Sequence, residues 1–439
     1  MDGSPYTPGA GHRPPVLAGR DELLRGWRTG LNDVTATGRQ RAPDMILTAP
    51  RGVGKTAAVL AFQDLCQEQG FEVVRLQAAS GNAGLVESLL RRARARAEEG
   101  PGPWRRAKRT FDRISGVTLP VVGGGVTIRD GRETPSPMRA SPEDLADALA
   151  VLASEVRKEH SGGGVLITID EIQAADRSDL TLLAAALQGL NTEYPDAPVM
   201  FAASGLPQTF QVLIDAGVTH PDRLFKFREV PLVLSGEDAR FAIVEAARQH
   251  HVAWEPEAAE MIVEISQGYP AHVQVFADET WMAARGPRVI TVGDAQAGIR
   301  AGADTLERES LGPRFDGLAQ REREFLTALV VNDGAATTAT LAITLGRPQQ
   351  SLSQVRDTLL TKGDVYSPRR GELALTVPVF ARYLRANYEA ARRRSSGPEL
   401  LPLEEMERNL DGLRARQGQE LPQPGRGPKT PRGLSRGGT

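Results

Sequence analysis

Residues 45–56 read MILTAPRGVGKT, and this stretch decides the fold. A short apolar run at residues 45–48 leads into a turn rich in glycine, and a helical pattern follows at residues 57–69. The turn matches the P-loop pattern G-x-x-x-x-G-K-[ST], except that Ala49 stands at the first glycine. That replacement is mild, because the first position only closes the turn after the strand. Strand, turn and helix in this order are the context that the pattern requires.

The P-loop pattern predicts a site for ATP and Mg²⁺. Glycines let backbone N–H groups curl around phosphate oxygens, and the helix that follows presents its positive N-terminal end to the same anion. We expect Lys55 to reach the β- and γ-phosphates and the Thr56 hydroxyl to bind Mg²⁺. The predicted nucleotide-binding residues of this stretch are Pro50, Arg51, Gly52, Val53, Gly54, Lys55, Thr56 and Ala57. The alternative is a chance glycine-rich turn with an exposed lysine, and the flanking strand and helix argue against it.

A second stretch, residues 165–171 (VLITIDE), reads as a buried strand that ends in two acids. Open α/β sheets bind ligands at the carboxyl ends of their strands. Asp170 is therefore predicted to hold Mg²⁺ through water, and Glu171 to orient and deprotonate the attacking water. An Asp-Glu pair after a strand can instead cap a helix, but the upstream P-loop favours the catalytic interpretation.

Strand and helix patterns alternate through the first half of the chain. Strands are predicted at residues 71–76, 164–169, 199–203 and 224–230, and helices at residues 144–156 and 179–194. Such alternation, with almost wholly apolar strands, indicates a parallel sheet covered by helices on both faces. The predicted fold class is α/β, with the parallel sheet of a P-loop NTPase.

The remaining patterns suggest how the chain divides. The predicted parts are a flexible N-terminus (1–14), an ATPase core (15–234) with an insertion at about 100–142 and a hairpin at 117–128, a helical lid (235–310), a winged helix (311–392) and a disordered tail (393–439). The tail is assigned because it is rich in Pro, Gly and Arg and poor in apolar residues.

Composition points to an ordinary globular protein, with 40% hydrophobic and 25% charged residues. No run is long and apolar enough to predict a membrane span, and the N-terminus does not read as a secretory signal. The single cysteine, Cys66, excludes an intramolecular disulfide and suits a reducing compartment. The cytoplasm is the expected location. The net charge of -2 means that any nucleic-acid contact needs a local basic patch.

Several further motifs occur in the order found in one known family. The chain resembles the AAA+ ATPases, within them the replication-initiator and origin-recognition-like branch and related prokaryotic ATPases, over roughly residues 15–390. The carriers are AGRDEL (18–23), the P-loop, IDEIQ (169–173), SGLP (204–207), RLF (223–225) and GYP (268–270). The P-loop and the Asp-Glu strand are specific, and the others are individually weak.

The resemblance implies further roles. Gly19 and Arg20 would lie beside the adenine, and Ser204 would act as a polar sensor near the γ-phosphate, although its hydroxyl could equally satisfy a strand end. Arg223 would reach the nucleotide of a neighbouring subunit in a homo-oligomer with shared active sites, unless it pairs with a nearby carboxylate; Arg228 is the second candidate for that role. Many relatives carry a lid arginine after Gly-x-Pro, and this chain instead has His272, which we expect to face the lid core.

The C-terminal part has a helix-turn-helix layout, with a helix at 340–345, a turn at 346–348 and a second helix at 349–362. Two strand-like runs around residues 368–371 complete the winged-helix pattern. The candidate contacts to double-stranded DNA are Gln349, Gln350, Arg356, Arg369 and Arg370. Winged helices also serve as protein-interaction modules, and the basic run at residues 91–109 is most simply a solvated helix face.

These patterns favour an ATPase that hydrolyses ATP to ADP and phosphate and couples its nucleotide state to a DNA-binding winged helix. The alternative function is an ATP-dependent assembly switch whose winged helix is a protein adaptor.

Overall fold

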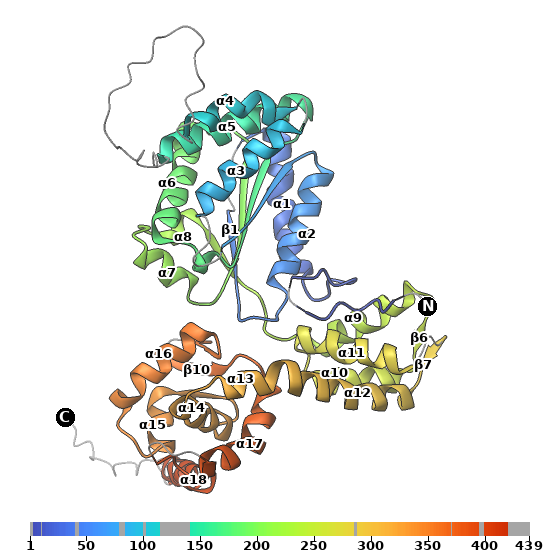
Figure 1. The fold of residues 1–439 in the computed structure, drawn as a ribbon, viewed down its shortest axis with the longest axis vertical. Helices are drawn as coiled ribbons and strands as arrows, with labels where there is room; N and C mark the ends of the chain where they lie inside the picture. The colour runs from blue at the N-terminus through green and yellow to red at the C-terminus, as the bar shows by residue number, and fades with distance from the viewer. Residues whose placement is uncertain are drawn as a thin grey trace, which may run out of the picture. The chain divides into compact units, whose positions relative to one another are not determined.

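The structure is a computed structural model. It describes residues 3–9, 11–39, 44–78, 84–99, 102–114, 141–284, 288–369, 371–394 and 399–419. The chain divides into two compact units, shown in Figure 1. The first comprises Met1–Arg314, Leu360–Tyr366 and Thr376–Val379, and the second comprises Phe315–Leu359, Ser367–Leu375 and Phe380–Thr439. Within the described residues, no helix has both the length and the apolar character that crossing a membrane requires.

The first unit is built around a five-stranded parallel sheet of order β2-β3-β4-β1-β5. The strands are β1 (Met45–Thr48), β2 (Glu72–Gln77), β3 (Val165–Asp170), β4 (Val199–Gly205) and β5 (Lys226–Glu229). The three central strands are almost wholly buried, as expected for a parallel sheet with helices on both faces. The predicted α/β class is confirmed. The order also brings the carboxyl ends of β1, β3 and β4 side by side, at one edge.

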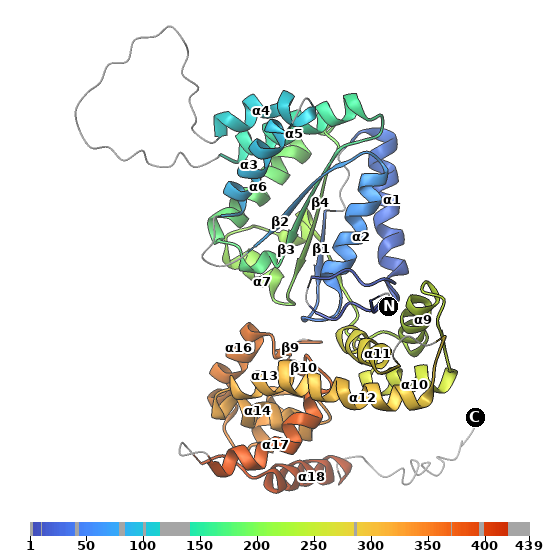
Figure 2. The ribbon, with the colours of Figure 1, turned by 45° about the vertical axis from the view of Figure 1, so that its right-hand side comes forward.

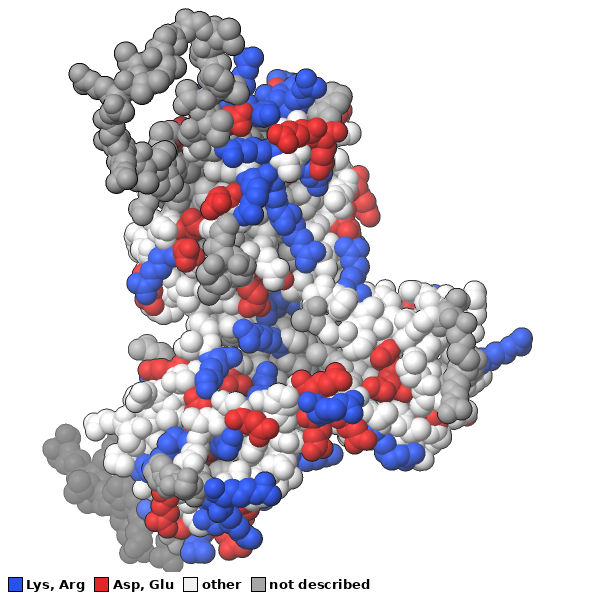
Figure 3. All heavy atoms as spheres, in the orientation of Figure 1, with Lys and Arg blue, Asp and Glu red and all other residues white. Residues whose placement is uncertain are grey.

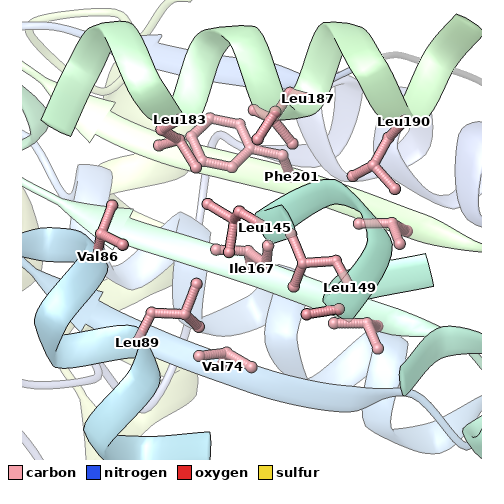
Figure 4. Close-up of a cluster of buried hydrophobic side chains, with 14 of the residues drawn as sticks. Val74, Val86, Leu89, Leu145, Leu149, Ile167, Leu183, Leu187, Leu190 and Phe201 are labelled. Atoms are coloured by element: carbon pink, nitrogen blue, oxygen red, sulfur yellow. The ribbon is translucent and has the colours of Figure 1, made fainter. Parts of the chain in front are cut away.

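Helices cover the two faces of this sheet (Figures 1 and 2). On one face lie α1 (Asp21–Thr37) and α2 (Lys55–Glu68), joined by the stacked rings of Trp27 and Phe62, whose centroids are 4.3 Å apart. The other face carries α3 (Leu85–Glu98), α4 (Pro103–Ile114), α5 (Pro142–Glu159) and α6 (Arg177–Glu193). Their leucines close over the apolar strand side chains in the core drawn in Figure 4. Each such leucine contributes roughly 1.5–3 kcal/mol of burial.

The predicted insertion at 100–142 is wrong for its first part. Helix α4 belongs to the core layer, because Trp104 and Phe111 are buried against the neighbouring helices. The flanking Gly and Pro residues had suggested a break in the pattern, but Pro103 is the first residue of α4. Residues 115–140, including the predicted hairpin, lie outside the described residues.

Four of the eight basic residues in the run at 91–109 pair with acids that the structure describes, namely Arg94, Arg96, Arg106 and Lys108. Arg94 lies 3.7 Å from Asp112, and Arg106 lies 2.8 Å from Glu159. Figure 3 shows Lys and Arg atoms interspersed with Asp and Glu atoms over α3 and α4. Because acids offset half of these charges, this face attracts a polyanion less strongly than the run of basic residues suggests.

Asp44 precedes β1 and is buried in the core. Its Oδ1 accepts a 3.0 Å hydrogen bond from the backbone N–H of Phe201, while its Oδ2 has no partner among the described residues. Burial raises the pKa of Asp44 from the ordinary 3.8 to about 7. The folded protein therefore holds this proton more tightly than the unfolded chain, and its free energy of unfolding falls as pH rises from about 4 to about 7.

We expect Asp44→Asn to remove this pH dependence. The amide oxygen keeps the bond from Phe201, and no charge is buried at high pH. The free energy of unfolding of the variant, minus that of the wild type, should be larger at pH 8 than at pH 4.5. The increase should be at most roughly 4 kcal/mol. Chemical denaturation at both pH values measures the difference. An equal effect of the substitution at the two pH values would contradict the assignment.

The lid follows the sheet within the first unit. Two short helices, α7 (Thr209–Asp215) and α8 (Pro221–Leu224), lead through β5 to α9 (Gly236–Arg248), β6 (Ala253–Trp254), α10 (Pro256–Ser266), α11 (Pro270–Ala284), β7 (Val289–Ile290) and α12 (Val292–Leu306). The Ser235 hydroxyl caps α9, and Thr291 with Asp294 forms a capping box on α12. These caps explain why α9 and α12 begin at the residues where they do.

The C-terminal part of the chain, after η2 (Glu307–Leu311) and α13 (Gly312–Asp316), follows the order helix, strand, two helices, two strands and two helices. Its elements are α14 (Gln320–Val331), β8 (Ala335–Thr337), α15 (Thr338–Thr344), η3 (Gln349–Leu352), α16 (Ser353–Lys362), β9 (Val365–Tyr366), β10 (Glu372–Leu375), α17 (Phe380–Arg394) and α18 (Leu403–Gln419). The strands form a sheet of order β8-β10-β9. The second helix predicted at 349–362 begins as a short 3₁₀ turn.

The predicted disordered tail is wrong for residues 399–416. Leu400, Met406 and Leu410 are buried in the second unit. The backbone of Leu401 donates to Glu324, a buried carboxylate that also pairs with Arg347 at 2.8 Å. The apolar face of α18 packs against the rest of the second unit and holds this segment in place. The rest of the helix is solvated. Residues 420–439 lie outside the described residues.

The flexibility predicted for residues 1–14 is also wrong for Tyr6. Its side chain is only 3% exposed and packs into the lid, against Trp254 and Trp281. A lone aromatic residue between prolines and glycines has no periodicity, so the pattern gave no sign of this contact.

Candidate nucleotide site

The P-loop has the backbone that its pattern predicts. Gly52 and Gly54 have φ of 77° and 88°, a left-handed conformation that favours glycine, and Gly54 caps the N-terminus of α2. A Cβ at Gly52 would collide with the Tyr269 hydroxyl. The loop therefore presents backbone N–H groups at a helix N-terminus, which suits an anion.

Lys55 lies inside this loop, with its side chain 5% exposed. Its Nζ donates a 2.7 Å hydrogen bond to the Pro50 carbonyl. Burial lowers the pKa of Lys55 to about 8, while Glu171 and Asp170 oppose that change. The amine is thus still charged at neutral pH, and it has only one hydrogen-bond partner among the described residues. A phosphate oxygen could occupy its remaining donors.

Asp170 is the last residue of β3 and lies beside Thr56 at the start of α2. Thr56 Oγ1 donates to Asp170 Oδ2 at 2.9 Å, and the Ser204 hydroxyl donates to Asp170 Oδ1. Hydroxyl and carboxylate oxygens are the ligands that Mg²⁺ prefers. Thr56 and Asp170 therefore fit a Mg²⁺ site, and Ser204 orients the carboxylate from the adjacent strand.

Glu171 stands directly after the strand in a left-handed conformation, with φ of 55°. Its backbone N–H donates to Ser204 Oγ at 3.3 Å, and its carboxylate accepts a 2.7 Å hydrogen bond from Gln173 Nε2. Gln173 Oε1 in turn accepts from the backbone N–H of Leu206 at 3.1 Å. The sequence motif contained Gln173, but its contact with Glu171 was not predicted.

One cavity of about 1090 Å³ joins most of these groups. It exceeds the 300–1,000 Å³ typical of ligand pockets, so a nucleotide fits by volume. Its lining includes the predicted residues Arg20, Arg51, Gly52, Val53, Gly54, Lys55, Thr56, Ala57, Asp170 and Glu171. Four predicted residues do not line it, namely Gly19, Pro50, Ser204 and Arg223.

Arg20 is held by the protein itself. It is 4% exposed, and its guanidinium donates to the carbonyls of Gly19 and Val53 at 2.9 and 2.8 Å. Burial lowers the pKa of Arg20. These bonds tie the segment before α1 to the P-loop, so Arg20 supports the loop as well as lining the cavity.

The lid reaches the P-loop through the turn before α11. The Tyr269 hydroxyl donates to the carbonyl of Arg51, and the N–H of Ala271 donates to the Gly52 carbonyl at 3.1 Å. His272 packs on the Tyr269 ring and lines the cavity. Burial lowers the pKa of His272 to about 4, so its imidazole is neutral at pH 7. Tyr269 is a contact that the sequence did not predict.

Arg223 and Arg228 lie elsewhere. Both side chains are exposed, on α8 and β5, and neither has a hydrogen bond or ion pair with any residue that the structure describes. The alternative in which Arg223 pairs with a nearby carboxylate therefore finds no partner among those residues.

The candidate DNA contacts all belong to the C-terminal part. Gln349 and Gln350 are exposed on η3, and Arg369 is exposed between β9 and β10. Arg356 pairs with Asp357 at 2.8 Å, which offsets its charge. Arg370 lies outside the described residues.

Comparison with known proteins places two families on the chain. Residues 16–201 match a family described as AAA ATPase domain. Residues 308–384 match a domain of unknown function, DUF8462. No protein with a curated description matches the sequence.

Solved structures resemble the chain at low identity. The Walker-type ATPase of Pyrococcus abyssi is 15% identical, with a TM-score of 0.56, over 85% of this chain and 97% of that one. The Aeropyrum pernix ORC2 protein, in ADPNP–ADP complexes, is 14% identical with a TM-score of 0.48, over 93% and 98%. The Thermotoga maritima RuvB Holliday junction branch migration motor is 15% identical with a TM-score of 0.41, over 87% and 96%.

Of these three, only the P. abyssi protein is similar enough in structure to bear on the fold. Its likeness and the family match agree with the sheet order and the P-loop, and the matched residues are those that build both. Residues 16–201 are thus similar to the AAA ATPase domain family, and the fold of the chain is that of an AAA+ P-loop ATPase.

Proposed function

We propose that the protein binds ATP with Mg²⁺ at the P-loop and hydrolyses it to ADP and phosphate. The observation that carries this proposal is one cavity lined by Lys55, Thr56, Asp170 and Glu171. A cationic amine, a pair of Mg²⁺ ligands and a general base are the groups that phosphoryl transfer to water needs. The alternative of a switch that holds ATP without turnover uses the same groups, apart from the base.

Each residue has a distinct role in this proposal. The N–H groups of residues 52–56 bind phosphate oxygens, and Lys55 moves its amine from the Pro50 carbonyl to the β- and γ-phosphates. Thr56 and Asp170 would hold Mg²⁺, and the metal would supply positive charge to the phosphates. Glu171 accepts the proton of the attacking water. The Ser204 hydroxyl keeps Asp170 in place, which makes it a positioning residue.

Arg223 is proposed to act on a neighbouring subunit. An exposed arginine without a partner among the described residues is available to stabilise transition-state charge in another copy. Arg223→Ala should then lower hydrolysis, and mixing it with Lys55→Ala should restore part of the activity, because each variant supplies what the other lacks. Phosphate release from mixtures that demonstrably co-assemble measures this. No recovery in such mixtures would argue against an arginine in trans.

We further propose that residues 311–392 form a winged helix that binds double-stranded DNA. Its element order and three-stranded sheet support this, together with the exposed Gln349, Gln350 and Arg369. The basic side chain of Arg369 would contact phosphate, and the glutamines would reach base edges. The alternative role of this winged helix is a protein adaptor.

The DNA proposal predicts a specific salt effect. Arg369→Ala should weaken binding to all duplexes alike and reduce the magnitude of the log–log salt slope by about one. Arg408→Ala, which removes an exposed arginine from α18, is the matched control and should leave the slope unchanged. Fluorescence anisotropy across a salt series measures both. A wild-type protein without affinity for duplex DNA at low salt would exclude DNA binding and favour the adaptor.

A further inference from the structure

The N-terminal segment is anchored in the lid through Tyr6. The Tyr6 hydroxyl donates to the carbonyl of Ile243 on α9 at 2.7 Å and accepts from Trp254 Nε1 at 3.0 Å. The ring meets Trp254 and Trp281 edge-on, with centroids 6.4 and 6.3 Å away. A buried tyrosine with both its ring and its hydroxyl satisfied is a strong attachment.

Neighbouring residues extend this attachment. The backbone N–H of Thr7 donates to Gln274 Oε1 on α11 at 3.0 Å, and Asp278 accepts a hydrogen bond from the Ser4 side chain. Figures 1 and 2 both draw the N-terminus beside α9. The segment is thus held by two lid helices and β6, at a sequence separation of more than 200 residues.

The other end of the segment is attached to the core. Arg13 forms a two-pronged pair with Asp64 on α2, at 2.7 and 2.8 Å. The Thr7 hydroxyl donates to the Arg13 carbonyl at 3.0 Å, which ties the two ends together. Helix α2 begins with Lys55 and Thr56, so the segment connects the lid to the helix that carries the phosphate-binding residues.

Between its two attachments, the segment lines the nucleotide cavity. Thr7, Pro8, Gly9, Gly11, His12 and Pro14 belong to the same lining as the P-loop residues. A ligand in this cavity is therefore enclosed by the core, by the lid and by this N-terminal segment. Widening the gap between lid and core requires one of the two attachments to open. The Arg13–Asp64 pair is half-exposed and weak, but the chain continues from it to Arg20, which is buried and bonded to the Val53 carbonyl of the P-loop. The core end therefore stays held when this pair opens, and the Tyr6 anchor provides most of the resistance.

We propose that residues 4–9 and 11–14 form a strap that retains the nucleotide, with Tyr6 as the positioning residue that fastens it to the lid. This proposal deepens the proposed function and rests on nucleotide binding at the P-loop. The strap controls how fast the nucleotide leaves. Thr56, Asp170 and Glu171, the residues proposed to hold Mg²⁺ and activate water, lie outside the strap, so we expect the rate of the chemical step to be unaffected.

Release of a fluorescent ATP analogue, chased with unlabelled ATP, tests the strap. Tyr6→Ala should speed release about tenfold or more, because it removes both the buried ring and its hydrogen bonds. Tyr6→Phe keeps the ring and should show a smaller increase. Single-turnover phosphate release should stay within about twofold of the wild type. Tyr194→Ala, which truncates a tyrosine at the end of α6 outside the cavity, is the control and should leave release unchanged.

Amide hydrogen exchange of the wild-type protein gives a second readout that needs no variant of Tyr6. ATP with Mg²⁺ should slow exchange in the strap, and Lys55→Ala should show no such protection. If the wild type binds no nucleotide, the proposed function itself fails. If it binds, the strap is overturned by unchanged release in folded Tyr6→Ala or, should that variant not fold, by unchanged exchange in the strap.

Discussion

Lys55→Ala is expected to abolish measurable ATP binding. Lys55 is a buried cation of the cavity, and its Nζ has a single hydrogen bond among the described residues to give up before it reaches phosphate. Charge-assisted bonds contribute roughly 1.5–3 kcal/mol each, so losing two of them weakens binding on the order of 10²–10⁴-fold. Titration with a fluorescent ATP analogue measures the loss.

The control for this experiment is Lys226→Ala, which removes an exposed lysine from the edge strand β5. It should bind ATP like the wild type. Circular dichroism should show that both variants are folded. A folded Lys55→Ala protein with unchanged affinity would mean that the nucleotide binds elsewhere.

Glu171→Gln should leave ATP binding intact and lower turnover at least tenfold. The amide cannot accept the proton of the attacking water, and general-base catalysis contributes on the order of 10²–10⁴ in rate. The substitution is nearly isosteric, so residue 171 should keep its left-handed backbone conformation. The amide oxygen can still accept the hydrogen bond from Gln173. Steady-state phosphate release, with binding measured in parallel, separates the two effects.

Glu193→Gln, at the exposed end of α6, is the matched control and should turn over at the wild-type rate. Wild-type turnover in Glu171→Gln would show that another group is the base. A wild-type protein that binds ATP without hydrolysing it would favour the assembly switch instead.

The sheet and the P-loop could be predicted because their signals are local. Residues 45–56 contain strand, turn and helix start in one contiguous stretch, and the apolar strands stand out by composition. Helix α4 was missed because Gly and Pro residues on both sides obscured the apolar spacing of Trp104, Ala107 and Phe111. Helix α18 was missed because its two buried apolar residues, Met406 and Leu410, stand among many charged ones.

The same contrast applies to the site. Lys55, Thr56, Asp170 and Glu171 follow motifs whose spacing reflects their chemistry. Tyr269 and Tyr6 act through contacts more than 200 residues apart in sequence, and local patterns carry no information about such pairs. Gln173 lies only two residues from Glu171, yet its orientation depends on the turn that follows β4.

The most direct test of the central claim is a crystal structure with a non-hydrolysable ATP analogue and Mg²⁺. We expect the triphosphate against the N–H groups of residues 52–56, with Lys55 Nζ moved from the Pro50 carbonyl to the β- and γ-phosphates. Mg²⁺ should lie between the Thr56 hydroxyl and Asp170. An analogue bound outside this cavity, or Lys55 still bonded to Pro50 with the nucleotide present, would contradict the account.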